Sequence, residues 1–155
     1  MDEAANIFLV GPMGSGKTAV GKQLARALGL PFVDSDAEIE QRTGVDIPLI
    51  FDKEGEAGFR TREREVIADL VMRRGIVLST GGGAFMADTN RHLIHEAGVS
   101  VCLRADLELL WQRVRHKSTR PLLRTENPRE TLRALYEARG PIYAMADLTV
   151  DSEAE

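Results

Sequence analysis

The chain has 155 residues and a formal net charge of −4, which suits a single domain with its own hydrophobic core. Its negative charge argues against a general binder of nucleic acid or of anionic membranes, and its 43% hydrophobic and 28% charged residues are ordinary for a globular protein. A single cysteine excludes an internal disulfide framework and, with no signal peptide or membrane-length apolar run in the sequence, favours the cytoplasm.

The segment Gly11–Thr18 reads GPMGSGKT and matches the phosphate-binding loop pattern G-x-x-x-x-G-K-[ST] without a substitution. An apolar run at 6–10 predicts a buried strand before it, and apolar residues at helical spacing predict a helix after it that stops at Gly29. Such a loop points backbone N–H groups at a polyphosphate; Lys17 would reach the terminal phosphates and Thr18 the accompanying Mg²⁺. A glycine-rich turn before an ordinary helix is the weaker alternative.

Strands and helices alternate along the rest of the chain. We expect further strands at 31–34, 76–78, 99–103 and 148–150. We expect a helix from about Asp36 to Gly44, a short helical turn at 47–51, and a longer helix from Phe59 that stops at Gly75. A further helix should run from a cap at Asn90 to Gly98, and another should follow a cap at Asp106. The last is expected from Arg129 to Tyr143, with or without a break at Gly140-Pro141. The pattern predicts an α/β fold in three layers, a five-stranded parallel sheet flanked by helices, as in P-loop NTPases.

The segment 115–128 has a different character. It carries five basic side chains and two prolines but few periodic apolar positions. We interpret it as a mobile lid over the nucleotide site; the alternative is a solvated surface loop. The whole chain, 1–155, is expected to form one kinase-like domain that includes this lid.

Polar residues follow two of the predicted strands. Ligands of parallel α/β sheets sit beyond the carboxyl ends of the strands, so Asp34, Asp36 and the turn at 80–83 should meet the phosphate loop. Asp34 is expected to hold Mg²⁺ through a water, because the third strand ends in Ser79 and Thr80 rather than in an acid. Asp36 could take the proton of an acceptor hydroxyl or orient it, or could be only a helix cap.

Two arginines and a glycine run suggest a second binding region. The planar forks of Arg60 and Arg139 suit a substrate carboxylate, although either could equally form a surface ion pair. Gly81-Gly82-Gly83 would let a ligand approach the backbone closely, or is a plain flexible turn.

His92 and His95 have no third ligand at zinc spacing. Cys102 is interpreted as a buried core residue, with a reactive thiol as the alternative.

Together, these motifs resemble the shikimate kinases from Ile7 to about Val150. The resemblance rests on Gly11–Thr18, Asp34-Ser35-Asp36, the segment 51–63, Ser79–Gly83, Arg120-Pro121-Leu122-Leu123, and Arg139 followed by Tyr143 and Ala146. It implies ATP- and Mg²⁺-dependent phosphorylation of the 3-hydroxyl of shikimate, a step on the route to aromatic amino acids.

The resemblance also implies roles for individual residues. Catalysis would fall to Lys17, Asp36 and Arg120, and the metal to Thr18 and Asp34. ATP would be bound by Gly11, Met13, Gly14, Ser15, Gly16, Lys17, Thr18, Ala19, Arg113 and Arg120. Shikimate would be bound, mainly by the subregion 35–62, through Asp36, Phe51, Phe59, Arg60, Gly81, Gly82, Gly83 and Arg139, with both arginines on its carboxylate.

One departure from the family and three rival functions remain. Shikimate kinases usually continue past the fifth strand, through a loop near adenine, into a last helix, whereas this sequence ends at Glu155; part of the adenine-side wall is therefore expected to be absent. The rivals are a gluconate kinase, a nucleoside monophosphate kinase and an inactive nucleotide-binding regulatory domain. We expect ATP and shikimate as partners, no nucleic acid or membrane, and a monomer, because no long exposed apolar stripe is left over.

Overall fold

A five-stranded sheet forms the centre of the computed structural model, which describes residues 5–115 and 121–151. The strands are β1 (Asn6–Val10), β2 (Phe32–Asp34), β3 (Val77–Ser79), β4 (Gly98–Arg104) and β5 (Leu148–Asp151). Their order across the sheet is β2-β3-β1-β4-β5, and every neighbouring pair is parallel. The predicted parallel α/β sheet is confirmed, with β3 displaced by one residue from the expected range.

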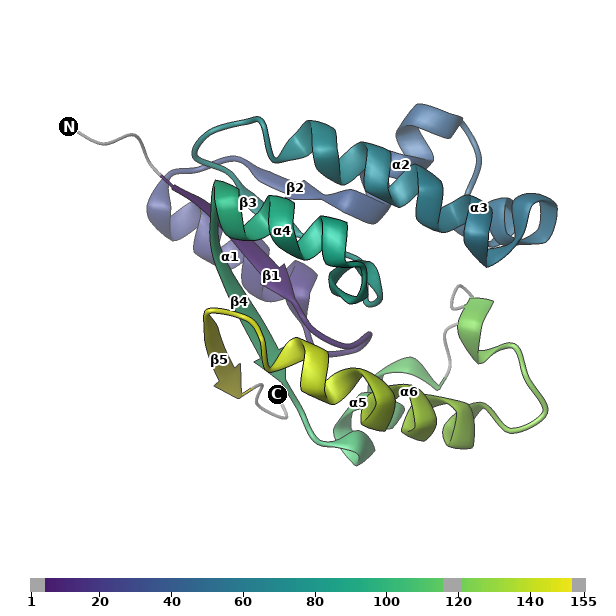
Figure 1. Cartoon of the computed structure of the whole chain (residues 1–155). Helices are drawn as coiled ribbons and strands as arrows, with labels where there is room; N and C mark the ends of the chain where they lie inside the picture. The colour runs from purple at the N-terminus through teal and green to yellow at the C-terminus, as the bar shows by residue number, and fades with distance from the viewer. Residues whose placement is uncertain (1–4, 116–120, 152–155) are drawn as a thin grey trace.

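Helices cover both faces of this sheet. They are α1 (Lys17–Leu28), α2 (Ser35–Thr43), α3 (Ile47–Leu70), α4 (Asp88–Ala97), α5 (Leu107–Val114) and α6 (Pro128–Tyr143), with short 3₁₀ turns η1 (Ala84–Met86) and η2 (Pro121–Leu123). In Figure 1, α4 lies in front of the sheet and α1 behind it, while α2–α3 and α5–α6 form two separate groups beside the end of β1. Within the described part of the chain, no helix is long and apolar enough to cross a membrane.

The alternation of side chains along the strands divides the core in two. In β1, Phe8 and Val10 face one cluster, which includes residues of α2, α3 and α4, while Leu9 faces the cluster beneath α1. Cys102 is a buried member of the first cluster, as predicted. Burial raises the pKa of its thiol, which disfavours the reactive thiolate.

The second face is only partly covered. In the strand register, Val101 of β4 pairs with Leu9 of β1 and with Leu148 of β5. These three side chains therefore lie on the same face of the sheet, the face that α1 covers. Helix α1 packs on β1, β2 and β3, and Leu148 and Val150 of the edge strand β5 remain 56% and 49% exposed. The edge strand therefore exposes a short apolar patch, and the expected monomer stays a prediction.

Several helix boundaries differ from the expectation for local reasons. The turn at 47–51 and the helix from Phe59 are joined into α3, which is interrupted only at Gly55, where φ is 74° and ψ is 178°. Helix α3 ends at Leu70, and Gly75 lies in the turn beyond it.

The predicted cap at Asn90 is wrong. Helix α4 already begins at Asp88, so Asn90 lies inside it, fully buried. Its Nδ2 donates to the carbonyl of Ala84 at 2.9 Å, which ties α4 to η1. Helix α6 continues through Gly140-Pro141, because Pro141 stands in its last turn and removes only one N–H donor.

Candidate active site

The phosphate loop lies between the end of β1 and the start of α1. Gly14 and Gly16 have φ values of 83° and 98°, a left-handed conformation that glycine adopts at little cost. Gly16 is also the N-cap of α1 and lacks a side-chain cap, so the first N–H groups of the helix remain available to an anion. The loop therefore has the geometry of an anion cradle.

Lys17 is the first residue of α1 and is 8% exposed. Its Nζ donates to the carbonyls of Gly11 at 2.6 Å and Pro12 at 3.1 Å. These bonds fold the side chain back over the loop and hold the ammonium at the mouth of the cradle.

Thr18 and Asp34 come together at the ends of α1 and β2. Thr18 Oγ1 donates to Asp34 Oδ2 at 3.4 Å, and Asp34 Oδ1 accepts from the backbone N–H of Asp36 at 3.0 Å. Asp34, and not Asp36, is thus the N-cap of α2. One carboxylate oxygen fixes the helix start, and the other faces the hydroxyl of the loop threonine.

These residues line a pocket of about 610 Å³, which we call the loop pocket. Its walls are Met13, Gly14, Gly16, Lys17, Thr18, Ala19, Asp34, Asp36, Ser79, Thr80, Gly81, Gly82 and Arg113. Arg113 reaches it from α5, and its Nη1 donates to the carbonyl of Gly14 at 2.7 Å. Two expected ATP-binding residues, Gly11 and Ser15, do not line it, and Arg120 lies outside the described residues.

A second pocket, which we call the arginine pocket, adjoins the first. It is lined by Met13, Asp36, Ile47, Phe51, Phe59, Arg60, Glu63, Gly81, Gly82, Gly83, Leu122 and Arg139. Phe51 and Phe59 form one wall, with ring centroids 4.9 Å apart. All eight residues expected to bind the acceptor are therefore brought to one hollow.

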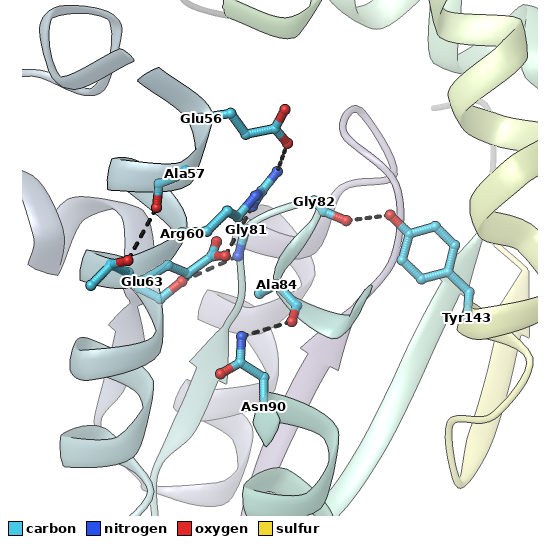
Figure 2. Close-up of polar contacts among 11 residues, drawn as sticks. Glu56, Ala57, Arg60, Glu63, Gly81, Gly82, Ala84, Asn90 and Tyr143 are labelled. Atoms are coloured by element: carbon cyan, nitrogen blue, oxygen red, sulfur yellow. Dashed lines mark hydrogen bonds and ion pairs between the residues drawn. The ribbon is translucent and has the colours of Figure 1, made fainter. Parts of the chain in front are cut away.

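Arg60 is held in place by two carboxylates and by the ring of Phe59. Its Nη1 donates to Glu63 Oε1 at 2.9 Å and its Nη2 to Glu56 Oε2 at 3.3 Å (Figure 2). The guanidinium also lies 5.2 Å from the centroid of the Phe59 ring. A side chain at Gly83 would meet this group, because a Cβ there would lie 2.4 Å from Arg60 Nη2. The glycine turn thus allows the guanidinium to lie directly against the backbone.

Glu63 lines the arginine pocket but was not among the site residues expected from the sequence. It is 1% exposed, and burial raises the pKa of its carboxyl, although Arg60 and Arg139 act to lower it. Among the described residues, its Oε2 has no hydrogen-bond partner. The available signal was a glutamate among the apolar positions of an amphipathic helix, where burial of a charge calls for a paired cation.

The two pockets share one wall, formed by Met13, Asp36, Gly81 and Gly82. The N–H of Gly81 donates to Ser35 Oγ at 3.1 Å, and a Cβ at Gly81 would come 2.7 Å from Asp36 Oδ1. The carboxylate of Asp36 is therefore packed against this turn, between the anion cradle and the paired guanidinium groups. A molecule in each pocket would meet at Asp36.

Comparisons with known proteins point to one family. The shikimate kinase profile matches residues 13–155. The chain is 62% identical over 149 residues to a shikimate kinase of Ruegeria pomeroyi, which covers 96% of this chain and 76% of that protein. It is also 62% identical over 146 residues to one of Cereibacter sphaeroides, with 94% and 73% covered. The solved structure of shikimate kinase from Acinetobacter baumannii in complex with shikimate matches with a TM-score of 0.95 at 49% identity, covering 97% of this chain and 84% of that one.

Proposed function

Because the chain belongs to the shikimate kinase family, we propose that the loop pocket and the arginine pocket together are its active site. ATP-dependent phosphorylation of shikimate is the activity of the family and of this chain, which is a P-loop kinase of the shikimate pathway. The observation that supports the site is the shared wall, which joins an anion cradle to a pocket with two guanidinium groups.

In this proposal, ATP lies in the loop pocket and shikimate in the arginine pocket. The guanidinium groups of Arg60 and Arg139 hold the carboxylate of shikimate, and Phe51 and Phe59 pack against its ring. This orientation turns the 3-hydroxyl toward Asp36 on the shared wall. The terminal phosphoryl group of ATP is transferred in line to this hydroxyl, and ADP is the leaving group, so that positioning supplies much of the rate enhancement.

Neutralisation of the charge on the transferred phosphoryl group is the second contribution to the rate enhancement. Lys17 and the N-terminus of α1 stabilise the negative charge that spreads over the transferred group. Asp36 orients the hydroxyl and accepts its proton. We also propose that Arg120 reaches the same phosphoryl group and that the segment 115–128 closes over the cleft and excludes water.

The residues present fit a magnesium ion. Thr18 Oγ1 and Asp34 Oδ2 are hard oxygen ligands 3.4 Å apart at the cradle. Among the described residues, no group of three or more His, Cys, Asp or Glu side chains is placed to hold a metal ion. Mg²⁺ takes few protein ligands, keeps several waters and would neutralise the phosphates when bound. We propose Thr18 as a direct ligand and Asp34 as a ligand through water.

Replacement of Asp34 by asparagine tests the metal assignment. The asparagine amide keeps an acceptor for the N–H of Asp36 but loses the charge, so we expect the Mg²⁺ concentration for half-maximal activity to rise about 10-fold or more. Titration of ADP release with MgCl₂ measures this. The control Asp46→Asn alters another helix cap, which accepts from Leu49 N–H at 3.0 Å outside both pockets. An unchanged Mg²⁺ requirement in Asp34→Asn would contradict the assignment.

Replacement of Arg60 by alanine tests the acceptor pocket. We expect KM for shikimate to rise about 10- to 100-fold, because a charge-assisted hydrogen bond is lost. KM for ATP should change little. The matched control is Arg62→Ala, which removes a half-buried arginine of the same helix that pairs with Glu54 at 2.7 Å and lines neither pocket. An effect confined to ATP would place Arg60 on the nucleotide side.

A coupled assay of ADP release tests the activity against its rivals. Shikimate should support turnover, whereas gluconate and nucleoside monophosphates should not, and turnover with none of them would favour an inactive regulatory domain. A cytoplasmic location is also a proposal, supported by the one cysteine of the sequence, whose thiol is free and buried.

A further inference from the structure

Tyr143, at the end of α6, is tied to the glycine turn after β3. It is 6% exposed, and its hydroxyl donates to the carbonyl of Gly82, which is 61 residues away in the sequence. Figure 2 shows the ring reaching across from α6 toward this turn. The bond therefore joins the helix that carries Arg139 to the shared wall of the two pockets.

The same hydroxyl also lies beside Arg139. Arg139 is one helical turn earlier on α6, a spacing that places the two side chains on one face. Burial raises the pKa of Tyr143, although the hydrogen bond and charge of Arg139 oppose this shift. The phenol is therefore protonated near neutral pH and can donate to Gly82.

Tyr143 does not itself line the arginine pocket. It lines a separate, mostly apolar cavity of about 190 Å³, which also contacts Pro12 and Cys102. The Tyr143 ring thus lies between the arginine pocket and this cavity, into which the ring could rotate. The hydroxyl contact with Gly82 opposes that movement.

We infer that Tyr143 is a positioning residue for the acceptor, which fixes the backbone of Gly82 and the guanidinium of Arg139 relative to each other before shikimate binds. Gly82 and Arg139 both line the arginine pocket, and a Cβ at Gly82 would lie 3.9 Å from Arg139 Nη1. Loss of the anchor leaves the same groups present but less well ordered, which weakens binding through the cost of ordering them. The inference rests on the proposed function, since it assigns Tyr143 to the shikimate side of that site.

The test is Tyr143→Phe, which keeps the buried ring and removes the hydroxyl. We expect the dissociation constant of shikimate, measured by calorimetry without nucleotide, and KM for shikimate to rise about 3- to 10-fold. KM for ATP should stay within about twofold, because Gly82 is the one loop-pocket residue that the lost bond held, and Lys17 and Thr18 keep their own contacts. The control is Tyr136→Phe, a half-buried tyrosine of the same helix that lines the same 190 Å³ cavity but not the arginine pocket. It should leave both KM values unchanged.

A double-mutant cycle with Arg139→Lys separates positioning from general destabilisation. If Tyr143 acts through Arg139, the effect of Tyr143→Phe on shikimate affinity should shrink in the Arg139→Lys background. The inference would be overturned if the effects of the two substitutions on shikimate affinity were fully additive. It would also be overturned if Tyr143→Phe kept its shikimate KM within twofold of wild type, raised both KM values equally, or failed to fold. Absence of shikimate-dependent ADP release from the wild-type protein would instead refute the proposed function, before any variant is compared.

Discussion

Replacement of Lys17 by methionine is expected to lower kcat by about 10³-fold, the loss typical of removing one preorganised group that stabilises transition-state charge. The side chain is nearly buried, and its ammonium is held by the carbonyls of Gly11 and Pro12 at the mouth of the anion cradle. Methionine preserves most of the apolar stem but supplies no charge. The developing charge on the transferred phosphoryl group would then lack the cation of the phosphate loop.

The measurement is the steady-state rate of ADP release at saturating ATP and shikimate. Lys22→Met is the matched control, because Lys22 is an exposed lysine of the same helix. It should retain wild-type turnover. The melting temperature of Lys17→Met should stay close to that of the wild type, since the fold of the loop depends on its glycines. Turnover of Lys17→Met near that of the wild type would contradict the assignment.

Replacement of Gly98 by alanine is expected to destabilise the fold by about 3 kcal/mol, the upper range for overpacking. Gly98 pairs with Asn6 between β4 and β1, and a Cβ there would lie 2.1 Å from the carbonyl oxygen of Asn6. Asn6 cannot easily retreat. Its side chain donates to the carbonyl of Arg73 at 2.6 Å and accepts from the N–H of Ile76 at 3.0 Å.

Thermal unfolding followed by circular dichroism measures this effect. For a chain of this size, a loss of about 3 kcal/mol corresponds to a fall in Tm of roughly 6–12 °C. The control is Gly140→Ala in α6, where a Cβ meets nothing within 4 Å. Alanine favours the helix over glycine, whereas the ring of Pro141 disfavours a side chain on the preceding helical residue; because these effects oppose each other, this variant should change Tm far less than Gly98→Ala. Equal Tm values for the two variants would show that β4 can move away from β1.

The sequence predicted the parts of the fold that depend on local chemistry. The phosphate loop, its flanking strand and the stop at Gly29 follow from a motif and from glycine conformation, and the structure has them as expected. Caps such as Asp106, which accepts from Leu109 N–H at 2.9 Å, are also local.

Long-range packing decided the rest. Asn90 has the residue type of a helix cap, but its amide is committed to Ala84 in the chain segment before the helix. Glu63 stands among the apolar positions of its helix in the sequence, but only the packing of α3 beside the glycine turn shows that its carboxylate is buried against Arg60. Arg60, Arg139 and Asp36 likewise meet at one pocket only because distant elements pack together. Their spacing in the sequence alone could not decide between a binding role and a surface ion pair or helix cap.

The strand order has a consequence for how the molecule loosens. β1 runs between two partners, whereas β5 has one partner and forms a margin of the sheet. None of the residues that line the two pockets belongs to β5. Fraying can therefore begin at this margin while the catalytic end of β1 remains intact, whereas fraying at the opposite edge, β2, would displace Asp34 and disturb the loop pocket directly.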